Sequence, residues 1–361
     1  MEQTDNTVEM LELLQRPAFL VKDNIITQTN YAADRRLLVP GTSLSQLLMT
    51  GQQEYADFSG GCLYLTLIVQ GIPCGATVTR AKDFDIFVLE QESDQTELEA
   101  MALAARELRQ PLSSVMTVAD RLFPMTATNE DPAVQEQVAR INRGLFQMLR
   151  IVSNMSDAYR YNQEQSHRFE LRDICDYLGE IFSKSAELIN HAGITLEYSI
   201  PSETIFTLIH AEKLERAVNN ILSNAVKFTP KGGKILVRLT RRNKMLYLTV
   251  EDNGDGIPEK LRKNVYSRFN REPVLEDSRY GIGLGMVLIR SAASEHGGTV
   301  LMEYPKEGGT RITMTLAISQ NRDAQVRSRI LSIDYAGERD HQLIEFSESL
   351  PVHLYEEKKI N

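Results

Sequence analysis

The sequence has no long hydrophobic run, no block of basic charge and no leader-like start. Its longest mainly apolar stretch spans residues 62–69 and includes Thr66, whereas about 20 apolar residues are needed to cross a bilayer. The N-terminus also lacks the positive start and apolar core of a signal peptide. These absences predict a cytoplasmic protein without membrane insertion.

Charge and cysteine content exclude further classes. The net charge is −9, from 40 basic and 49 acidic residues, so nucleic acid is not an expected partner. The cysteines Cys62, Cys74 and Cys175 are odd in number and match no metal spacing, which favours buried structural thiols. Hydrophobic residues make up 42% and charged residues 25%, which is ordinary for a globular protein, and 361 residues suffice for two or three domains.

Changes of pattern divide the chain and predict a multidomain α+β protein. Residues 1–92 alternate short apolar runs with turn signals, which predicts a small antiparallel sheet, and the order of elements resembles a PAS sensor domain. Residues 93–166 carry two heptad series, which predict a helical hairpin. Residues 167–320 mix strand and helix periods and predict an α/β sandwich. Residues 321–361 form a C-terminal extension with a helical pattern near residues 342–350 and no assigned role.

The heptads also predict an oligomeric state. A hairpin that is apolar along one stripe cannot bury that stripe alone, so two copies are expected to form a four-helix bundle. We therefore expect a homodimer through residues 93–166. The first series consists of Leu98, Met101, Ala105, Leu108, Leu112, Val115, Ala119 and Leu122.

A helix predicted over residues 212–228 carries Asn220, Asn224 and Lys227 at i, i+4 and i+7, on one helical face. Carboxamide oxygens can ligate Mg²⁺ and a lysine can neutralise phosphate oxygens, so this face suits a triphosphate with its metal. Any one of these residues alone would be an ordinary polar residue on a wet face. The opposite side of the helix is apolar and consists of Ile221, Leu222, Ala225 and Val226.

Two glycine-rich segments follow this helix in the chain. Residues 252–258 read Asp-Asn-Gly-Asp-Gly-Ile-Pro at the end of an apolar strand, where a carboxylate can accept a hydrogen bond from an exocyclic amine such as that of adenine. Residues 281–285 read Gly-Ile-Gly-Leu-Gly before a helix, where bare N–H groups favour phosphate. The polar stretch between them contains Arg268 and is long enough to be a mobile lid over a nucleotide. Each glycine segment alone is weak evidence for a site.

In order and spacing, these segments resemble the N, G1, F and G2 boxes of the histidine-kinase ATP-binding domain, which gyrase and certain chaperones share more distantly. The likeness covers residues 94–318. It implies that the chain binds ATP and Mg²⁺, with Asn220 on the metal, Asn224 and Lys227 on the phosphates and Asp252 on adenine. The other residues that it implies around the nucleotide are Phe228, Gly254, Gly256, Ile257, Arg268, Gly281, Gly283, Leu284, Gly285 and Thr310.

The first heptad helix resembles the family's phosphoacceptor box, Ser-His-Glu-Leu-Arg-Thr-Pro-Leu, but reads Ala-Arg-Glu-Leu-Arg-Gln-Pro-Leu over residues 105–112. Arg106 stands in place of the histidine, next to the seam and on its exposed side. A guanidinium keeps its proton and offers no free lone pair, so it cannot replace imidazole as the nucleophile. Glu107, which helps to activate the histidine in the family's kinases, would face a cation instead. Autophosphorylation at this position is therefore not expected.

The chain's own histidines offer no evident substitute. Histidines at surface or helix-capping positions are more common than acceptors, and none of the six stands in a comparable motif. They are His167, His191, His210, His296, His341 and His353.

Hydrolysis is disfavoured as well. Hydrolytic relatives place a glutamate, the general base for water, one helical turn before the second asparagine, where this chain has Asn220. A neutral amide cannot take the proton of water. Nucleotide binding or phosphoryl transfer is therefore expected in place of fast ATP hydrolysis.

These features support alternative functions. One is a histidine-kinase-type phosphotransferase of two-component signalling, with a response regulator as partner. The alternative is a nucleotide-gated pseudokinase scaffold that regulates a partner by binding without phosphoryl transfer. A third, a serine/threonine-directed kinase of the anti-sigma type, shares the ATP domain but usually lacks the hairpin.

Overall fold

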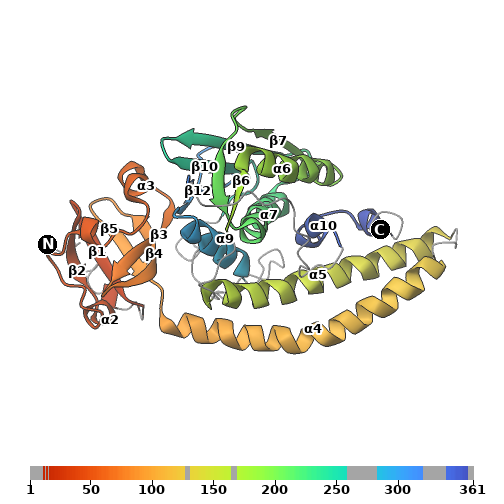
Figure 1. The fold of residues 1–361 in the computed structure, drawn as a ribbon, viewed down its shortest axis with the longest axis horizontal. Helices are drawn as coiled ribbons and strands as arrows, with labels where there is room; N and C mark the ends of the chain where they lie inside the picture. Colours follow the sequence, from red (N-terminus) through yellow and green to blue (C-terminus); the bar gives the residue numbers. More distant parts are fainter. Residues whose placement is uncertain are drawn as a thin grey trace.

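A long mixed sheet runs through the molecule (Figure 1). The computed structural model describes residues 11–12, 14, 16–126, 131–163, 169–257, 283–319 and 339–356. Within these ranges the sheet has ten strands in the order β2-β1-β5-β4-β3-β11-β12-β10-β9-β7. The first half of this order comes from the N-terminal domain and the second half from an α/β domain that lies far away in sequence.

The N-terminal domain, residues 16–91, contains the expected antiparallel sheet, in which short strands alternate with turns and small helices. Its core includes Phe19 and Phe87, whose rings stack with centroids 5.0 Å apart. Cys62 is a buried thiol as predicted, whereas Cys74 is only half-buried. The elements are β1 (Ala18–Lys22), β2 (Ile25–Thr29), α2 (Tyr31–Asp34), η1 (Leu44–Gln46), α3 (Gln52–Asp57), β3 (Cys62–Val69), β4 (Ile72–Arg80) and β5 (Asp85–Leu89).

The hairpin consists of α4 (Glu92–Thr126) and α5 (Pro132–Gln163), which run antiparallel along one side of the molecule (Figure 1). The heptad positions of α4 fall into two sets. Every second one, Leu98, Ala105, Leu112 and Ala119, is buried. Between them, Met101 is half-buried, and Leu108, Val115 and Leu122 are 50%, 53% and 53% exposed. The hairpin therefore buries one stripe internally and leaves a second apolar stripe open. None of the described helices is both long and apolar enough to cross a membrane.

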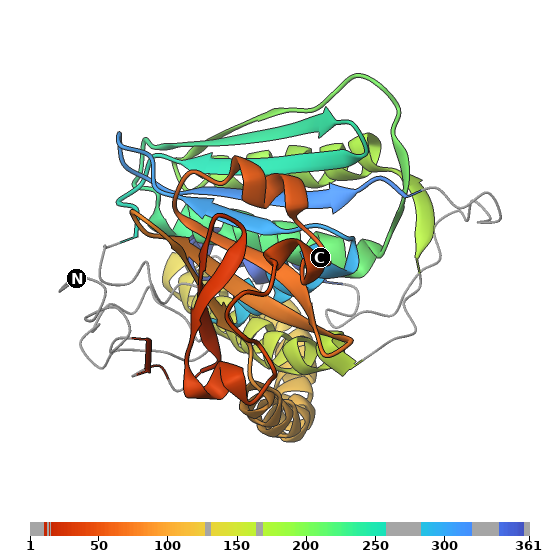
Figure 2. The ribbon, with the colours of Figure 1, turned by 90° about the vertical axis from the view of Figure 1, so that its left-hand side faces the viewer.

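The α/β domain, residues 169–319, packs helices α6, α7 and α9 on one face of its part of the sheet (Figures 1 and 2). The side chain of Asp173 accepts the N–H of Cys175, so that α6 is capped and begins at Ile174. The elements are β6 (Glu170–Asp173), α6 (Ile174–Asn190), β7 (Thr195–Ser199), β8 (Phe206–Ile209), α7 (Ala211–Phe228), β9 (Lys234–Arg242), β10 (Met245–Asp252), α9 (Leu284–Glu295), β11 (Val300–Glu303) and β12 (Arg311–Ala317).

The two domains meet at a strand pair. β3 pairs antiparallel with β11, with Tyr64 opposite Val300 and Cys62 opposite Met302. Figure 2 shows the orange strands of the N-terminal domain continuing beside the blue strands β11 and β12. The edge of each sheet is thereby covered by the other.

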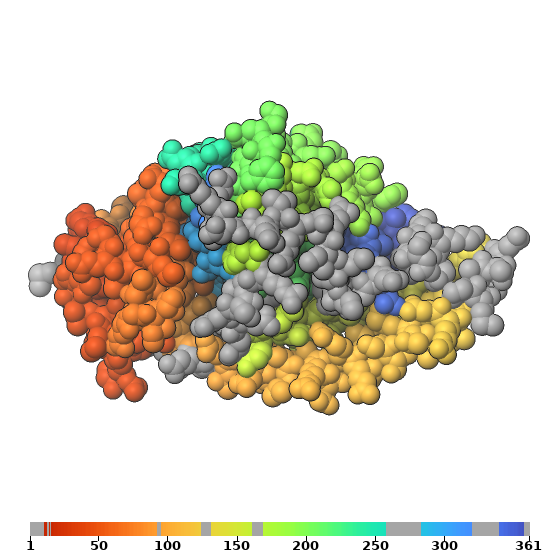
Figure 3. All heavy atoms as spheres, in the orientation of Figure 1, coloured from red at the N-terminus to blue at the C-terminus, as the bar shows by residue number. Residues whose placement is uncertain are grey.

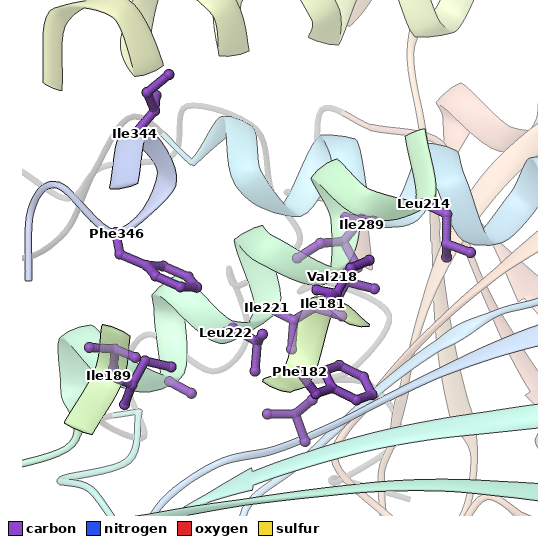
Figure 4. Packing of buried hydrophobic residues seen from close by; sticks show 14 of the residues in the cluster. Ile181, Phe182, Ile189, Leu214, Val218, Ile221, Leu222, Ile289, Ile344 and Phe346 are labelled. Carbon is purple, nitrogen blue, oxygen red and sulfur yellow. The ribbon is translucent and has the colours of Figure 1, made fainter. Parts of the chain in front are cut away.

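The C-terminal segment, residues 339–356, is part of the folded core. It contains α10 (His341–Glu345) and the 3₁₀ turn η2 (Val352–Tyr355), so the helix ends earlier than the predicted pattern over residues 342–350. The segment lies between the α/β domain and the hairpin (Figure 3). Ile344 and Phe346 are fully buried, and Figure 4 shows the Phe346 ring directed toward Leu222 of α7.

Candidate functional site

Helix α7 holds the first part of the candidate site. Its apolar side is buried as predicted, so its polar residues are fixed in position. Asn220 is 1% exposed, and its Nδ2 donates to the Arg216 carbonyl at 2.8 Å. A Cβ placed on Gly285 would lie 2.8 Å from Asn220 Oδ1. Asn220 therefore lies directly against the first turn of α9. This contact joins α7 to the second glycine segment.

The two carboxamides of α7 differ in access. Asn220 is enclosed, whereas Asn224, one turn later, is half-buried. Among the described residues, no group of three or more His, Cys, Asp or Glu side chains is arranged to hold a metal ion. Carboxamide oxygens are suitable ligands for Mg²⁺. Asn224 is the more accessible of the two asparagines.

Asp252, at the end of β10, forms the second part of the site. It is 7% exposed, and its Oδ1 accepts hydrogen bonds from the N–H groups of Gly254 at 2.9 Å and Thr310 at 3.3 Å. Burial raises the pKa of Asp252 to about 6, although these hydrogen bonds act in the opposite direction. Because both donors meet Oδ1, the described residues leave Oδ2 as the acceptor for an incoming N–H group.

Glycines bring the walls around Asp252 into contact. A Cβ on Gly254 would lie 2.1 Å from the Phe228 carbonyl oxygen, and one on Gly309 would lie 1.9 Å from the Asp252 carbonyl oxygen. Only glycine permits such approaches. The neighbouring Asn253 has a structural role, since its Oδ1 accepts the N–H of Lys234 at 2.7 Å. The ends of α7, β10 and β12 thus converge on one carboxylate.

The second glycine segment is described only from Gly283 onward; Arg268, Gly281 and the predicted lid lie outside the described residues. Gly283 has a φ of +82° and caps α9 without a side-chain hydrogen bond. Leu284, which was expected beside the base, is buried in a cluster with Leu98 and Ala158 of the hairpin. The start of α9 therefore contacts both Asn220 and the hairpin.

Lys227 is engaged by the chain itself. Its Nζ lies 2.5 Å from Oε2 of Glu348 in the C-terminal segment. This segment had no predicted role, although the helical pattern near residues 342–350 indicated that it folds. No pattern in the sequence indicated the contact between this segment and Lys227.

Arg106 and Glu107 are both exposed on α4, next to the buried Ala105, as the heptad phase predicted. Several histidines have structural partners. The side chain of His210 caps α7 by accepting the backbone N–H of Lys213. The backbone N–H of His210 donates to Nε2 of His296 at 3.0 Å. Burial lowers the pKa of His296. His341 lies 3.0 Å from Glu215, and His167 is outside the described residues.

Comparisons with known proteins show what this chain is similar to. Residues 209–320 match the family described as histidine kinase-, DNA gyrase B-, and HSP90-like ATPase. The chain is 27% identical over 260 residues to hybrid signal transduction histidine kinase D of Dictyostelium discoideum, covering 70% of this chain and 17% of that protein. It is 27% identical over 246 residues to sensor histidine kinase WalK of Bacillus subtilis, covering 65% and 39%. The chain therefore spans well under half the length of either relative.

A solved structure shares the fold. The crystal structure of full-length ShkA in complex with AMPPNP superposes with a TM-score of 0.50 at 21% identity, covering 62% of this chain and 47% of that one. The residues that match the ATPase family, 209–320, include α7, β10 and α9, which build the candidate site. In sequence the chain is similar to sensor histidine kinases, and its residues 209–320 match an ATPase-type domain.

Proposed function

We propose that this chain binds ATP with Mg²⁺ and works in two-component signalling without an acceptor histidine at residue 106. The observation that carries the proposal is the buried Asp252 carboxylate at the meeting point of α7, β10 and β12. A buried carboxylate with one oxygen held by backbone N–H groups is suited to accept the exocyclic amine of adenine on its other oxygen. The related ShkA, crystallised with AMPPNP, supports a nucleotide as the ligand.

The other side chains fit a nucleotide beside Asp252. Asn224 would meet Mg²⁺ together with Asn220, the ligand expected from the family pattern, and the backbone N–H groups after Gly283 would meet phosphate. The half-buried Ile257 and Phe228 would line the base together with Gly254 and Gly256. Thr310 holds the carboxylate of Asp252 in place through its backbone N–H.

The assembly is also part of this proposal. The exposed stripe of Leu108, Val115 and Leu122 on α4 would be covered by the hairpin of a second copy, which makes a homodimer. A response regulator is the proposed signalling partner, and the N-terminal domain is the proposed sensor. The proposed location is the cytoplasm.

Calorimetric titration with AMPPNP and MgCl₂ tests the nucleotide site. In Asp252→Asn the side-chain oxygen can keep its two backbone donors, while an NH₂ group replaces the free acceptor. Losing a charged hydrogen bond is expected to weaken binding about 10- to 100-fold. The matched control is Asp255→Asn, an exposed change in the same turn, which should bind like the wild type. Equal affinities of all three proteins would contradict the role of Asp252.

Incubation with γ-labelled ATP separates a kinase from a scaffold. The wild type is expected to retain no label, because the guanidinium of Arg106 is no nucleophile. If the rest of the transfer machinery is intact, Arg106→His should acquire acid-labile label, and Arg106→Gln should not. Binding without label in Arg106→His would favour the alternative function, a nucleotide-gated pseudokinase scaffold. Acid-labile label on the wild type would overturn our reading of Arg106.

A further inference from the structure

The C-terminal segment fills a groove between α5 and α7. Leu343, Ile344, Phe346 and Leu350 are buried there, and the ring of Tyr355 packs edge-on against Phe146 of α5, with centroids 5.5 Å apart. Burying this much apolar surface holds the segment in the groove. Figure 4 shows Phe346 directed toward the side chains of α7 and Ile344 pointing away from them, and both belong to one buried cluster.

A buried carboxylate fixes the position of the segment. Glu345 is 0% exposed and lies 3.1 Å from Nε of Arg150 on α5 and 2.5 Å from Nη1 of Arg216 on α7. The Ser223 hydroxyl of α7 donates to the Glu345 carbonyl at 2.9 Å. One residue of the segment therefore contacts both walls of the groove, and its register cannot slip without burying unpaired charges.

Three residues further on, Glu348 reaches the candidate nucleotide site. Its carboxylate lies 2.5 Å from Lys227 Nζ and 3.2 Å from Nη1 of Arg150. Although burial opposes charge on Glu348, Arg150 and Lys227 outweigh it and lower its pKa. A carboxylate on a lysine uses the same electrostatic chemistry as a phosphate oxygen on a lysine.

We propose that residues 339–356 are a built-in ligand of the groove between α5 and α7, and that Glu348 competes with nucleotide phosphate for Lys227. This inference rests on the proposed function, because it requires phosphate at α7. Docking of the segment and binding of nucleotide then oppose each other, and linkage makes the opposition reciprocal. Because the segment also contacts α5, nucleotide binding weakens its hold on the hairpin, which gives the chain an internal means of regulation.

Calorimetric titration of the full chain tests the competition with two probes, AMPPNP with MgCl₂ and adenosine. Glu348→Gln is expected to bind AMPPNP about five-fold more tightly than the wild type, the upper range for one partly exposed ion pair. Adenosine has no phosphate, so its affinity should stay the same. The control Glu187→Gln removes an exposed charge on α6 and should change neither affinity. Glu348→Asp, which keeps the charge but shortens the side chain, should fall between wild type and Glu348→Gln.

A double-mutant cycle identifies Lys227 as the shared group. In a Lys227→Gln background, Glu348→Gln should no longer change the affinity for AMPPNP. Equal AMPPNP affinities of wild type and Glu348→Gln would overturn the competition and leave the proposed function intact. An equal gain for both probes would mean a general loosening, which also overturns it. Absence of binding by either probe to wild type and Glu348→Gln alike would instead overturn the proposed function.

Discussion

The α/β domain contacts the rest of the chain at several places, and two of these attachments use different forces. At β11 the N-terminal domain is attached by backbone hydrogen bonds between two strands. At α7 the C-terminal segment is attached by buried ion pairs and an apolar plug. The first attachment extends a sheet, and the second closes a groove.

Side chains reinforce the strand joint without determining it. Arg290 of α9 lies over the Tyr64 ring at 4.8 Å and 3.4 Å from the Glu90 carboxylate. The hydroxyls of Thr66 and Ser294 are 3.0 Å apart. Each contact adds to a ladder that the backbone already makes. In the groove, by contrast, the fully buried Glu345 pairs with both arginines, which also pair with Glu348 and Asp157. Loss of one side chain should therefore matter more at the groove than at the joint.

The largest effect is expected from Glu345→Ala, which breaks the groove attachment. Removing one partner of a buried ion pair leaves Arg150 and Arg216 undercompensated and typically costs about 3–5 kcal/mol of unfolding free energy. Urea denaturation followed by circular dichroism would measure it. Glu136→Ala is the matched control, because it removes an exposed ion pair with Arg140 that is worth less than about 0.5 kcal/mol. A loss no larger than that of the control would refute the difference between the two attachments.

The second prediction concerns Asp252→Asn, which removes the charge of the buried carboxylate at the end of β10. Unlike Glu345, Asp252 is met by backbone N–H groups in place of arginines, and burial raises its pKa from 3.8 to about 6. The folded state then binds the proton more tightly than the unfolded state. The cost to stability is therefore absent below pH 4, grows as the pH rises to about 6 and is complete above it.

Two pKa units correspond to about 3 kcal/mol at most, so Asp252→Asn is expected to stabilise the fold by about 2 kcal/mol at pH 8 and by less at pH 5. Urea midpoints at the two pH values would measure the gain, with Asp255→Asn as the control in the same turn. A destabilised Asp252→Asn at pH 8 would mean that the carboxylate is held more favourably than its burial implies.

Arg290→Met tests the strand joint with a side chain that keeps much of the apolar stem. Loss of the contacts with Tyr64 and Glu90 is expected to cost about 2 kcal/mol. Because Glu90 is partly exposed, it can turn toward water after the change. Hydrogen exchange should rise in β3 and β11, while α10 stays protected. Equal increases in both regions would mean that the two attachments unfold as one unit.

The sequence predicted the α/β domain well because its signals are local. The apolar and polar sides of α7 are separated by helical periodicity, and the glycines around Asp252 are required wherever two backbones approach this closely. The helix predicted over residues 212–228 accordingly spans Ala211–Phe228 in the structure. The early end of the α10 helix illustrates the limit, because tertiary packing overrides a short helical pattern.

Neither attachment was predicted, and the reasons differ. Strand pairing is made by the backbone, so the sequence of β3 does not name β11 as its partner. The continuous apolar run of residues 62–69 was nonetheless a signal, since a strand buried on both faces does not alternate. In the C-terminal segment, Glu345 and Glu348 look like surface acids, and their arginine and lysine partners lie more than a hundred residues earlier. Long-range charge pairing leaves no periodicity to detect.

The smallest effect is expected from Thr66→Val, which deletes one hydrogen bond at the joint and keeps the shape of the side chain. The hydroxyl of Ser294 would lose its partner on β3, at a cost of about 1 kcal/mol. In a Ser294→Ala background the same change should cost little, because the unpaired hydroxyl is then absent. Urea denaturation of the four proteins in this cycle would measure the coupling. A coupling energy near zero would mean that the backbone ladder of β3 and β11 alone holds the joint. A coupling energy as large as the loss of stability from Glu345→Ala would contradict the difference between the two attachments, because the strand joint would then depend on a side chain as much as the groove does.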